Sequence, residues 1–274
     1  MPRPCSPRGR QPVPRQQLNT PRKPRQPERW MPPKIWTGKT VYILGGGWSL
    51  SMTPVDQLRD RGPVLGCNVA FIDWPWIDAV YIGDQPCLLR LLPDLERWHS
   101  AAPGKLIMSK HPGSTPTAPW IHHFTHSQHL AGIDTRPGQI CGNRSTGGGA
   151  INVAVQLGAA RIVLLGYDMC ANQHVQDGEP HRCNYHDRHL PRSRYARPQD
   201  MPSPAQTKQQ RRRHAPPPLP ATRGADRFAT FSRPFVEIAA ALQKLRVSVY
   251  TCTEGTSALT TFPRVTFAEA LEMV

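Results

Sequence analysis

Two glycine-rich turns contain the residue types that most directly indicate ligand chemistry. One is "ILGGGWSL" at residues 43–50, and the other is "NRSTGGGAIN" at residues 143–152. Backbone N–H groups of such turns, together with the N-terminus of the helix that follows, favour a bound phosphate. Two turns of this kind predict one ligand with several polar groups, such as a nucleotide diphosphate or a nucleotide sugar. The candidate residues in the turns for binding this ligand are Gly45, Gly46, Gly47, Ser49, Ser145, Thr146 and Gly147.

Neither turn is the dinucleotide-binding fingerprint. G-x-G-x-x-G requires a glycine where Leu50 stands, and the acid expected after the second strand is replaced by Asn68. A purely structural tight turn is the alternative for the first stretch. In the second, helix capping accounts for a hydroxyl but not for three glycines, since each costs about 1 kcal/mol relative to alanine inside a helix. Close approach of a ligand or of another helix is therefore expected there.

Polar residues also follow the other predicted strands. Asn68 can donate and accept at once, which suits a ribose hydroxyl or a base edge, although an Asn can also simply fill a left-handed turn. Asp84 ends another strand and is a further candidate for the ligand site. Asp168 follows the apolar run "IVLLGY" and can bind a ribose, a metal or an acceptor hydroxyl, or cap a loop.

A histidine-rich stretch, "HRCNYHDRH", follows Asp168 after a short interval. A histidine with a near-neutral pKa is a natural general base for an acceptor hydroxyl, and His181 and His186 are the candidates. Nearby cysteines and histidines make a zinc site conceivable, but their spacings match none of the usual patterns. We therefore assign no metal site.

Short apolar runs alternate with helical patterns along the chain. Strands are predicted at 41–44, 63–68, 78–84, 105–109, 162–165 and 247–252, and helices at 53–60, 85–98, 147–157, 234–245 and 266–274. Pro93 should kink or divide the second helix. This alternation, with nearly continuous apolar strands, predicts a Rossmann-like α/β fold: a mostly parallel sheet with helices on both faces. Ligands of such sheets bind beyond the carboxyl ends of the strands.

Charge is concentrated in two proline-rich segments. Of the 274 residues, 1–39 contain ten Lys or Arg against one acid, and 182–233 contain twelve against three. We predict a disordered basic tail at 1–37 and one α/β domain at 38–274 with a flexible basic insertion at 182–227. Such segments attract polyanions, so nucleic acid, here DNA, is the first partner to consider and an anionic membrane surface the second. A merely solubilising tail is the plain alternative.

Cysteine usage and hydropathy indicate the compartment. Seven cysteines without paired spacing fit a reducing environment better than a disulfide framework. No segment offers the roughly 18 apolar residues that a membrane span needs, and the basic amino terminus lacks the apolar core of a secretory signal. A cytoplasmic protein without membrane partners is expected.

Several segments together resemble a known family. The ordered set "ILGGGWSL", "GCN", "STGGGAINVAVQLGAARIVLLGYDM", "GEPHRCNYH" and "VSVYTCTEGTSAL" resembles phage-encoded, sialyltransferase-like glycosyltransferases of the GT-A-like, Rossmann-type class. These proteins are related to bacterial CMP-sialic-acid sialyltransferases and to archaeal 6-hydroxymethylpterin diphosphokinases. The resemblance covers most of residues 40–274 apart from the basic insertion, and residues 145–169 carry its strongest part.

The resemblance implies roles for particular residues. In the sialyltransferases the first turn reads G-N-G-P-S, and its Asn holds the nucleotide together with the Asn after the second strand. Asn68 matches the second Asn, whereas Gly46 replaces the first and Trp48 replaces the proline. The family's T-S-G helix start corresponds to residues 145–147 and implies contacts to the donor nucleotide.

The implied reaction is transfer from a nucleotide-sugar donor to a hydroxyl group. The family's histidine base lies after the G-x-D strand, in the interval that holds His181 and His186, and Asp168 is the reserve candidate. The basic segments and a phage setting make a 5-hydroxymethylpyrimidine in DNA, such as 5-hydroxymethylcytosine, the expected acceptor, within an infected bacterial host. One alternative is an ATP- and magnesium-dependent pyrophosphokinase with Asp84 and Asp168 as ligands. Another is a non-catalytic DNA-binding or virion protein.

Overall fold

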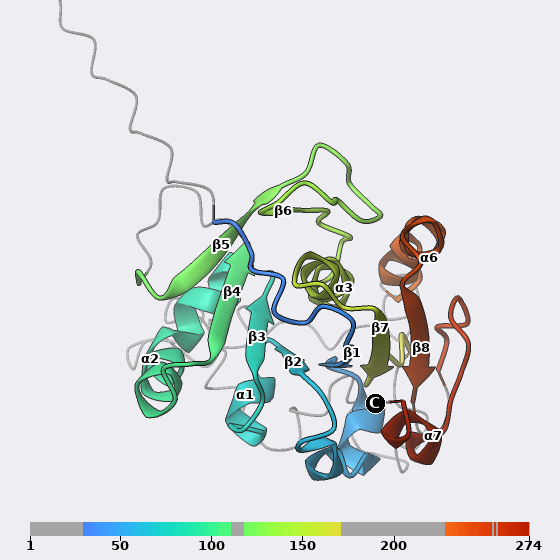
Figure 1. Cartoon of the computed structure of the whole chain (residues 1–274), viewed down its shortest axis with the longest axis horizontal. Helices are drawn as coiled ribbons and strands as arrows, with labels where there is room; N and C mark the ends of the chain where they lie inside the picture. Colours follow the sequence, from blue (N-terminus) through green and yellow to red (C-terminus); the bar gives the residue numbers. More distant parts are fainter. Residues whose placement is uncertain (1–29, 111–117, 171–227, 254, 256, 274) are drawn as a thin grey trace, which may run out of the picture.

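The protein folds around a single eight-stranded sheet in which every strand pair is parallel. The computed structural model describes residues 30–110, 118–170, 228–253, 255 and 257–273 (Figure 1). The strand order is β6-β5-β4-β3-β2-β1-β7-β8, with helices on both faces. The predicted Rossmann-like α/β class is confirmed.

Strands and helices alternate as the sequence predicts except between β4 and α3, where two strands that were not predicted, β5 and β6, follow. The strands are β1 (Thr40–Leu44), β2 (Val64–Cys67), β3 (Ala79–Ile82), β4 (Leu106–Lys110), β5 (Ile121–His126), β6 (Gln139–Ile140), β7 (Arg161–Leu165) and β8 (Ser248–Cys252). The α-helices are α1 (Ala70–Asp73), α2 (Gln85–Ala101), α3 (Thr146–Gln156), α6 (Pro234–Leu245) and α7 (Phe267–Leu271). No helix among the described residues is long and apolar enough to cross a membrane.

Alternating side chains of each strand enter two separate apolar cores. Val41 and Ile43 of β1 pack with α3 and α6 on one face, whereas Tyr42 and Leu44 pack with α1, α2 and α7 on the other. All four side chains are fully buried. Burial on both faces explains why the strands are apolar without a break, as in other covered parallel sheets.

The strand order reverses between β1 and β7. From β1 the chain adds β2 to β6 on one side, and then returns to place β7 and β8 on the other side of β1 (Figure 1). The loops that leave β1 and β7 therefore diverge at the carboxyl end of the sheet. In open α/β sheets this switch point is the usual position of a ligand.

One helix prediction is wrong. The stretch 53–60 forms no α-helix: it contains the 3₁₀ turn η2 (Val55–Leu58), and a second 3₁₀ turn, η1 (Trp48–Met52), precedes it. The backbone turns away after η2 because Asp60 adopts a left-handed conformation with φ 63°. Helix α2 runs through Pro93 as one element instead of dividing there.

The residues just before position 38 are part of the folded domain. Residues 30–37, which the sequence placed in the tail, pack against the sheet: Trp30 stacks on His122 of β5 with ring centroids 4.4 Å apart, and Trp36 is buried. The Trp36 N–H donates to the Leu157 carbonyl at the end of α3. Two indole rings thus anchor this segment despite its prolines. The predictions for 1–29 and for the insertion at 182–227 lie outside the described residues.

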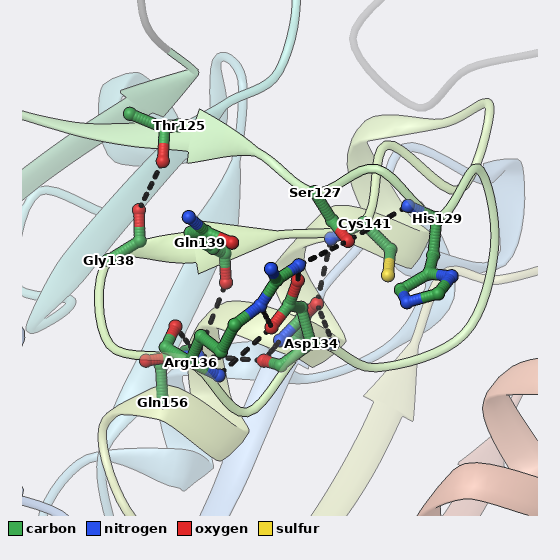
Figure 2. A network of polar contacts seen from close by, with 10 residues as sticks. Thr125, Ser127, His129, Asp134, Arg136, Gly138, Gln139, Cys141 and Gln156 are labelled. Atoms are coloured by element: carbon green, nitrogen blue, oxygen red, sulfur yellow. Dashed lines mark hydrogen bonds and ion pairs between the residues drawn. The ribbon is translucent and has the colours of Figure 1, made fainter.

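Buried amide side chains of α3 hold the segment that leads from β5 to α3. The carboxamide of Asn152 accepts from the N–H groups of Asp134 and Cys141, both at 2.9 Å, and donates to the Asp134 carbonyl. Gln156 donates to the carbonyls of Asp134, Arg136 and Gln139 (Figure 2). Apart from the short strand β6, the segment forms no helix or strand, and the side chains of α3 supply part of its backbone hydrogen bonds.

An ion pair completes this network. The Arg136 guanidinium bridges both carboxylate oxygens of Asp134, at 3.0 and 2.6 Å, and also reaches the Ser127 hydroxyl (Figure 2). The hydrogen bond from Arg136 holds the pKa of Asp134 well below its usual range. Asp134 is thus a structural anion of the loop at neutral pH.

We expect Asn152→Ala to lower the free energy of unfolding by about 2–4 kcal/mol. The change leaves two buried N–H groups, those of Asp134 and Cys141, without partners, and each such group costs about 1–3 kcal/mol, whereas the Asp134 carbonyl keeps its hydrogen bond from Gln156. Urea unfolding measures the effect. Gln243→Ala, on the exposed side of α6, is the matched control and should stay within about 0.5 kcal/mol. Equal effects of the two changes would contradict the role of Asn152.

Candidate functional site

A cleft of about 860 Å³ lies at the carboxyl end of the sheet, where the strand order reverses. Its walls come from the loops after β1, β2, β3 and β7, from the ends of β4 and β5, and from the N-terminus of α3. The predicted residues that line it are Gly46, Gly47, Asn68, Asp84, Ser145, Thr146, Gly147 and Asp168. The two candidate bases His181 and His186 lie outside the described residues.

Gly45 and Ser49 lie behind the wall of the cleft. Ser49 is buried, and both its N–H, at 2.8 Å, and its hydroxyl donate to the Asp168 carboxylate. Asp168 in turn lines the cleft from the loop after β7. Its carboxylate therefore joins the loops of β1 and β7 across the switch point.

The glycines of the first turn let these two loops approach closely. A Cβ on Gly45 would lie 2.5 Å from the Gly166 carbonyl oxygen, and a Cβ on Gly47 would lie 2.5 Å from the carboxyl carbon of Asp168. The N–H of Gly45 donates to Leu165 and that of Gly47 to Gly166, each at 2.7 Å. The turn thus uses most of its donors within the chain, and only the Gly46 N–H is without a partner among the described residues.

Burial dominates the electrostatics of Asp168. Desolvation raises the pKa of this carboxyl above its ordinary value, although the hydrogen bonds from Ser49 and from the Trp48 N–H act in the opposite direction. A carboxylate in this position is less available as a base, because Ser49 already occupies both of its oxygens.

The glycines of the second turn admit side chains of the sheet rather than a second helix. A Cβ on Gly147 would lie 2.8 Å from the Tyr167 ring, and one on Gly149 would lie 2.8 Å from the Tyr81 ring. The Tyr167 hydroxyl donates to the Gly147 carbonyl at 3.1 Å. Close packing of α3 on two tyrosines therefore explains the glycines, which the sequence alone attributed to a ligand or another helix.

The first turn of α3 faces the cleft with its donors and hydroxyls. Ser145 caps the helix, since its hydroxyl accepts from the Gly148 N–H at 3.0 Å. Thr146 lies against the loop after β3, where a Cβ on Gly83 would be 3.0 Å from its hydroxyl oxygen. The positive end of the helix dipole and the Thr146 hydroxyl together favour an anionic group in the cleft.

The position of Asn68 fits both interpretations from the sequence, a left-handed turn and a side chain that contacts a ligand. It adopts φ 53°, so it does occupy a left-handed turn, and its backbone N–H donates to the Tyr81 carbonyl. Its side chain also lines the cleft, and its Oδ1 is buried without a hydrogen-bond partner. A buried amide oxygen of this kind costs free energy unless a further group pairs with it.

The wall opposite Asp168 is basic, which the sequence analysis missed. Arg90 of α2, Lys110 at the end of β4, His126 at the end of β5 and Arg144 before α3 all line the cleft. The strand β5 itself escaped prediction because its polar "IHHFTH" pattern does not read as an apolar run. Its two buried side chains, Ile121 and Phe124, lie in the two different cores, so the sequence shows neither an apolar run nor an alternating pattern here.

His126 combines a fixed ring with an altered pKa. A Cβ on Gly142 would lie 3.1 Å from its Cε1, so the ring packs closely on the segment that precedes α3. Burial, and then the charge of Lys110, lower the pKa of His126 below its ordinary value. The imidazole is therefore neutral at physiological pH and able to accept a proton.

Two of the cysteines that line the cleft, Cys67 and Cys87, are poor nucleophiles. Burial raises the pKa of the Cys67 thiol to about 12 and that of Cys87 to about 11, so both are protonated at neutral pH. Among the described residues, no three His, Cys, Asp or Glu side chains group as a metal site. The arrangement favours binding and proton transfer over covalent chemistry.

Comparisons of the chain with protein-family models, with curated proteins and with solved structures found no match. The relation to sialyltransferase-like glycosyltransferases therefore stays a prediction. The fold and the cleft are established by the structure itself.

The raised pKa of Asp168 predicts how the free energy of unfolding changes with pH. An aspartate titrates near pH 3.9 in an unfolded chain, and the pKa of Asp168 is higher in the folded protein. The folded state thus binds more protons between the two pKa values, and this group's contribution to stability falls as pH rises through them. We expect the free energy of unfolding of the wild type, relative to Asp168→Asn, to decrease as the pH rises above about 4.

Asp134→Asn provides the opposite case. Because the pKa of Asp134 is lowered by Arg136, its contribution is present above about pH 3.9 and is lost only below it. The advantage of the wild type over Asp134→Asn should therefore not decrease over the same range. A wild-type advantage over Asp168→Asn that stays constant or grows with pH would contradict the account of Asp168.

Proposed function

We propose that this protein is a glycosyltransferase that binds a nucleotide-sugar donor in the cleft and transfers the sugar to an acceptor hydroxyl. The observation that supports this proposal most strongly is the composition of the cleft: a helix N-terminus, an orphaned amide oxygen on Asn68 and a basic wall converge at the switch point of a parallel sheet. The resemblance of residues 40–274 supplies the reaction class.

The donor's phosphates are proposed to bind between the first turn of α3 and the basic wall. The Thr146 hydroxyl, the helix dipole and the side chains of Arg90 and Lys110 are the groups that can balance their charge. The Gly46 N–H is available on the other side. The nucleoside would then lie toward Asn68, whose amide suits a ribose hydroxyl or a base edge.

The transfer needs one base and one leaving group. The acceptor oxygen forms a bond to the anomeric carbon, the bond from that carbon to the phosphate oxygen breaks, and the base takes the hydroxyl proton. Cations at the basic wall stabilise the charge that develops on the leaving phosphate. We propose His126 as the base because it lines the cleft as a neutral imidazole, with His186 and His181 as the alternatives named by the resemblance.

The proposed acceptor is a 5-hydroxymethylpyrimidine in DNA, such as 5-hydroxymethylcytosine. A net charge of +15 at pH 7 favours association with a polyanion, and the basic segments 1–37 and 182–227 are the proposed contacts. An enzyme that acts on a base must reach it in the groove or flip it out of the stack.

The direct test offers the full chain a panel of nucleotide sugars with hydroxymethylated and unmodified DNA. Mass spectrometry of the DNA detects a transferred sugar, and we expect transfer from one donor to the hydroxymethylated DNA alone. Absence of both transfer and donor hydrolysis across the panel would contradict the proposal.

Changes at the two turns should weaken donor binding without unfolding the protein. Gly46→Val obstructs the free N–H of the first turn, and Thr146→Val removes the hydroxyl at the start of α3, so we expect affinity to fall about tenfold or more in each. Calorimetry measures the affinity for the donor identified above. Thr125→Val, on β5 outside the cleft, is the matched control and should bind normally. Unaltered affinity in both cleft variants would exclude a shared site.

His126→Gln should lower the rate of single-turnover transfer by about 10²- to 10⁴-fold with donor affinity retained, as expected for loss of a positioned base. Lys110→Gln provides a sharper test, because removal of this cation raises the pKa of His126. The base must be neutral, so the acidic limb of the pH–rate profile should move to higher pH. If the acidic limb of Lys110→Gln stayed in place and His126→Gln transferred the sugar at the normal rate, His126 would not be the base. The base would then be His186 or His181.

A further inference from the structure

A second hollow, of about 840 Å³, lies at the opposite end of the sheet from the cleft. It is lined by the segments that precede β1, β2, β3 and β4, which meet at the amino ends of these strands. We call it the basic groove, because four cations outnumber two acids along it. Its charged residues are Lys39, Arg59, Arg61, Lys105, Asp60 and Asp78.

Part of the groove is fixed by internal contacts. Arg59 pairs with Asp56 at 3.0 Å and lies over the Trp76 ring, with its guanidinium carbon 4.8 Å from the centroid. The Trp76 indole N–H also donates to Asp56 at 2.8 Å. Lys105 donates to the Trp76 carbonyl at 2.6 Å. This side of the groove is therefore a preorganised wall with an aromatic ring at its centre.

The other side presents two exposed cations, Lys39 and Arg61. Neither side chain has a hydrogen-bond or ion-pair partner among the described residues. Their backbones are held together, because Gly62 approaches Thr40 so closely that a Cβ there would lie 2.7 Å from the Thr40 carbonyl oxygen. Fixed spacing of two unpaired cations is a means of binding successive negative charges.

The size of the groove favours an extended anion over a single small one. Neighbouring strands lie about 4.8 Å apart, so the segments before β1 to β4 span about 14 Å. A nucleic-acid strand carries a phosphate about every 3.4 Å of helix axis, so about four phosphates can lie across this span. Aromatic side chains beside cations are also typical of grooves that bind nucleic acids.

We propose that the basic groove binds the phosphodiester backbone of a nucleic acid, with Lys39 and Arg61 as the principal contacts. Strands of four or five residues separate the groove from the cleft by about 15 Å. The groove therefore binds a different stretch of nucleic acid from any base that reaches the cleft. The proposal does not rest on the transferase activity and stands or falls separately from it.

The test compares salt dependence of DNA binding by the full chain and by a double variant, Lys39→Gln with Arg61→Gln. The loss of two phosphate contacts should reduce the slope of log affinity against log salt by about 1.8 for duplex DNA and about 1.4 for a single strand. Lys244→Gln with Arg246→Gln, two exposed cations of the α6 terminus that do not line the groove, removes the same charge and should leave the slope nearly unchanged. Fluorescence anisotropy with labelled duplex and single-stranded oligonucleotides gives both slopes.

Several outcomes would overturn the proposal. One is an unchanged slope in the groove variant, and another is an equal reduction in the groove and control variants, which would indicate a general charge effect. A third is weaker binding to vesicles containing phosphatidylserine without any change toward DNA. Because both side chains are exposed, the thermal transition should be retained, and Arg61→Gln alone should give about half of the slope change.

Discussion

The contact between Ser49 and the Asp168 carboxylate determines how the two halves of the sheet meet. It joins the loops after β1 and β7, which diverge at the point where the strand order reverses. Glycines at 45 and 47 permit this contact, because any larger residue would overlap the backbone of Gly166 or the carboxyl group itself. The first glycine-rich turn therefore binds an anionic group of the protein itself, the Asp168 carboxylate. The same contact builds this wall of the cleft, and Gly46, which lines the cleft, keeps an N–H without a partner among the described residues.

Helix α3 transmits this geometry to the rest of the site. Its glycine face packs on Tyr81 and Tyr167, so its first turn is held at the mouth of the cleft. Its buried amides, Asn152 and Gln156, hold the segment after β5, and this segment leads to Arg144 of the basic wall. One helix therefore fixes the proposed phosphate site and the approach of Arg144, whereas Arg90 and Lys110 are positioned by α2 and β4. The basic groove lies at the other end of the strands, where Trp36 joins it to the end of α3.

The sequence predicts most of the sheet because burial on both faces leaves uninterrupted apolar runs, as in β1 and β7. It fails where tertiary contacts replace local preference. The strand β5 is mostly polar, with only two buried side chains. Residues 30–37 contain prolines and yet are anchored by Trp30 and Trp36. For the site, position after a strand correctly places Asn68 and Asp168 at the cleft. No local pattern shows that the carboxylate of Asp168 is occupied by Ser49, since that contact joins residues 119 positions apart.

The central claim is that the cleft at the carboxyl end of the sheet binds an activated nucleotide. Hydrogen–deuterium exchange of the full chain with and without a saturating nucleotide-sugar donor tests it most directly, because it reports the site without assuming the reaction. The account predicts slower exchange at residues 46–48, 68–70 and 144–148, with unchanged exchange at 59–62 in the basic groove. The account would be contradicted if exchange slowed only in the basic groove, or if no donor that binds slowed exchange in the cleft.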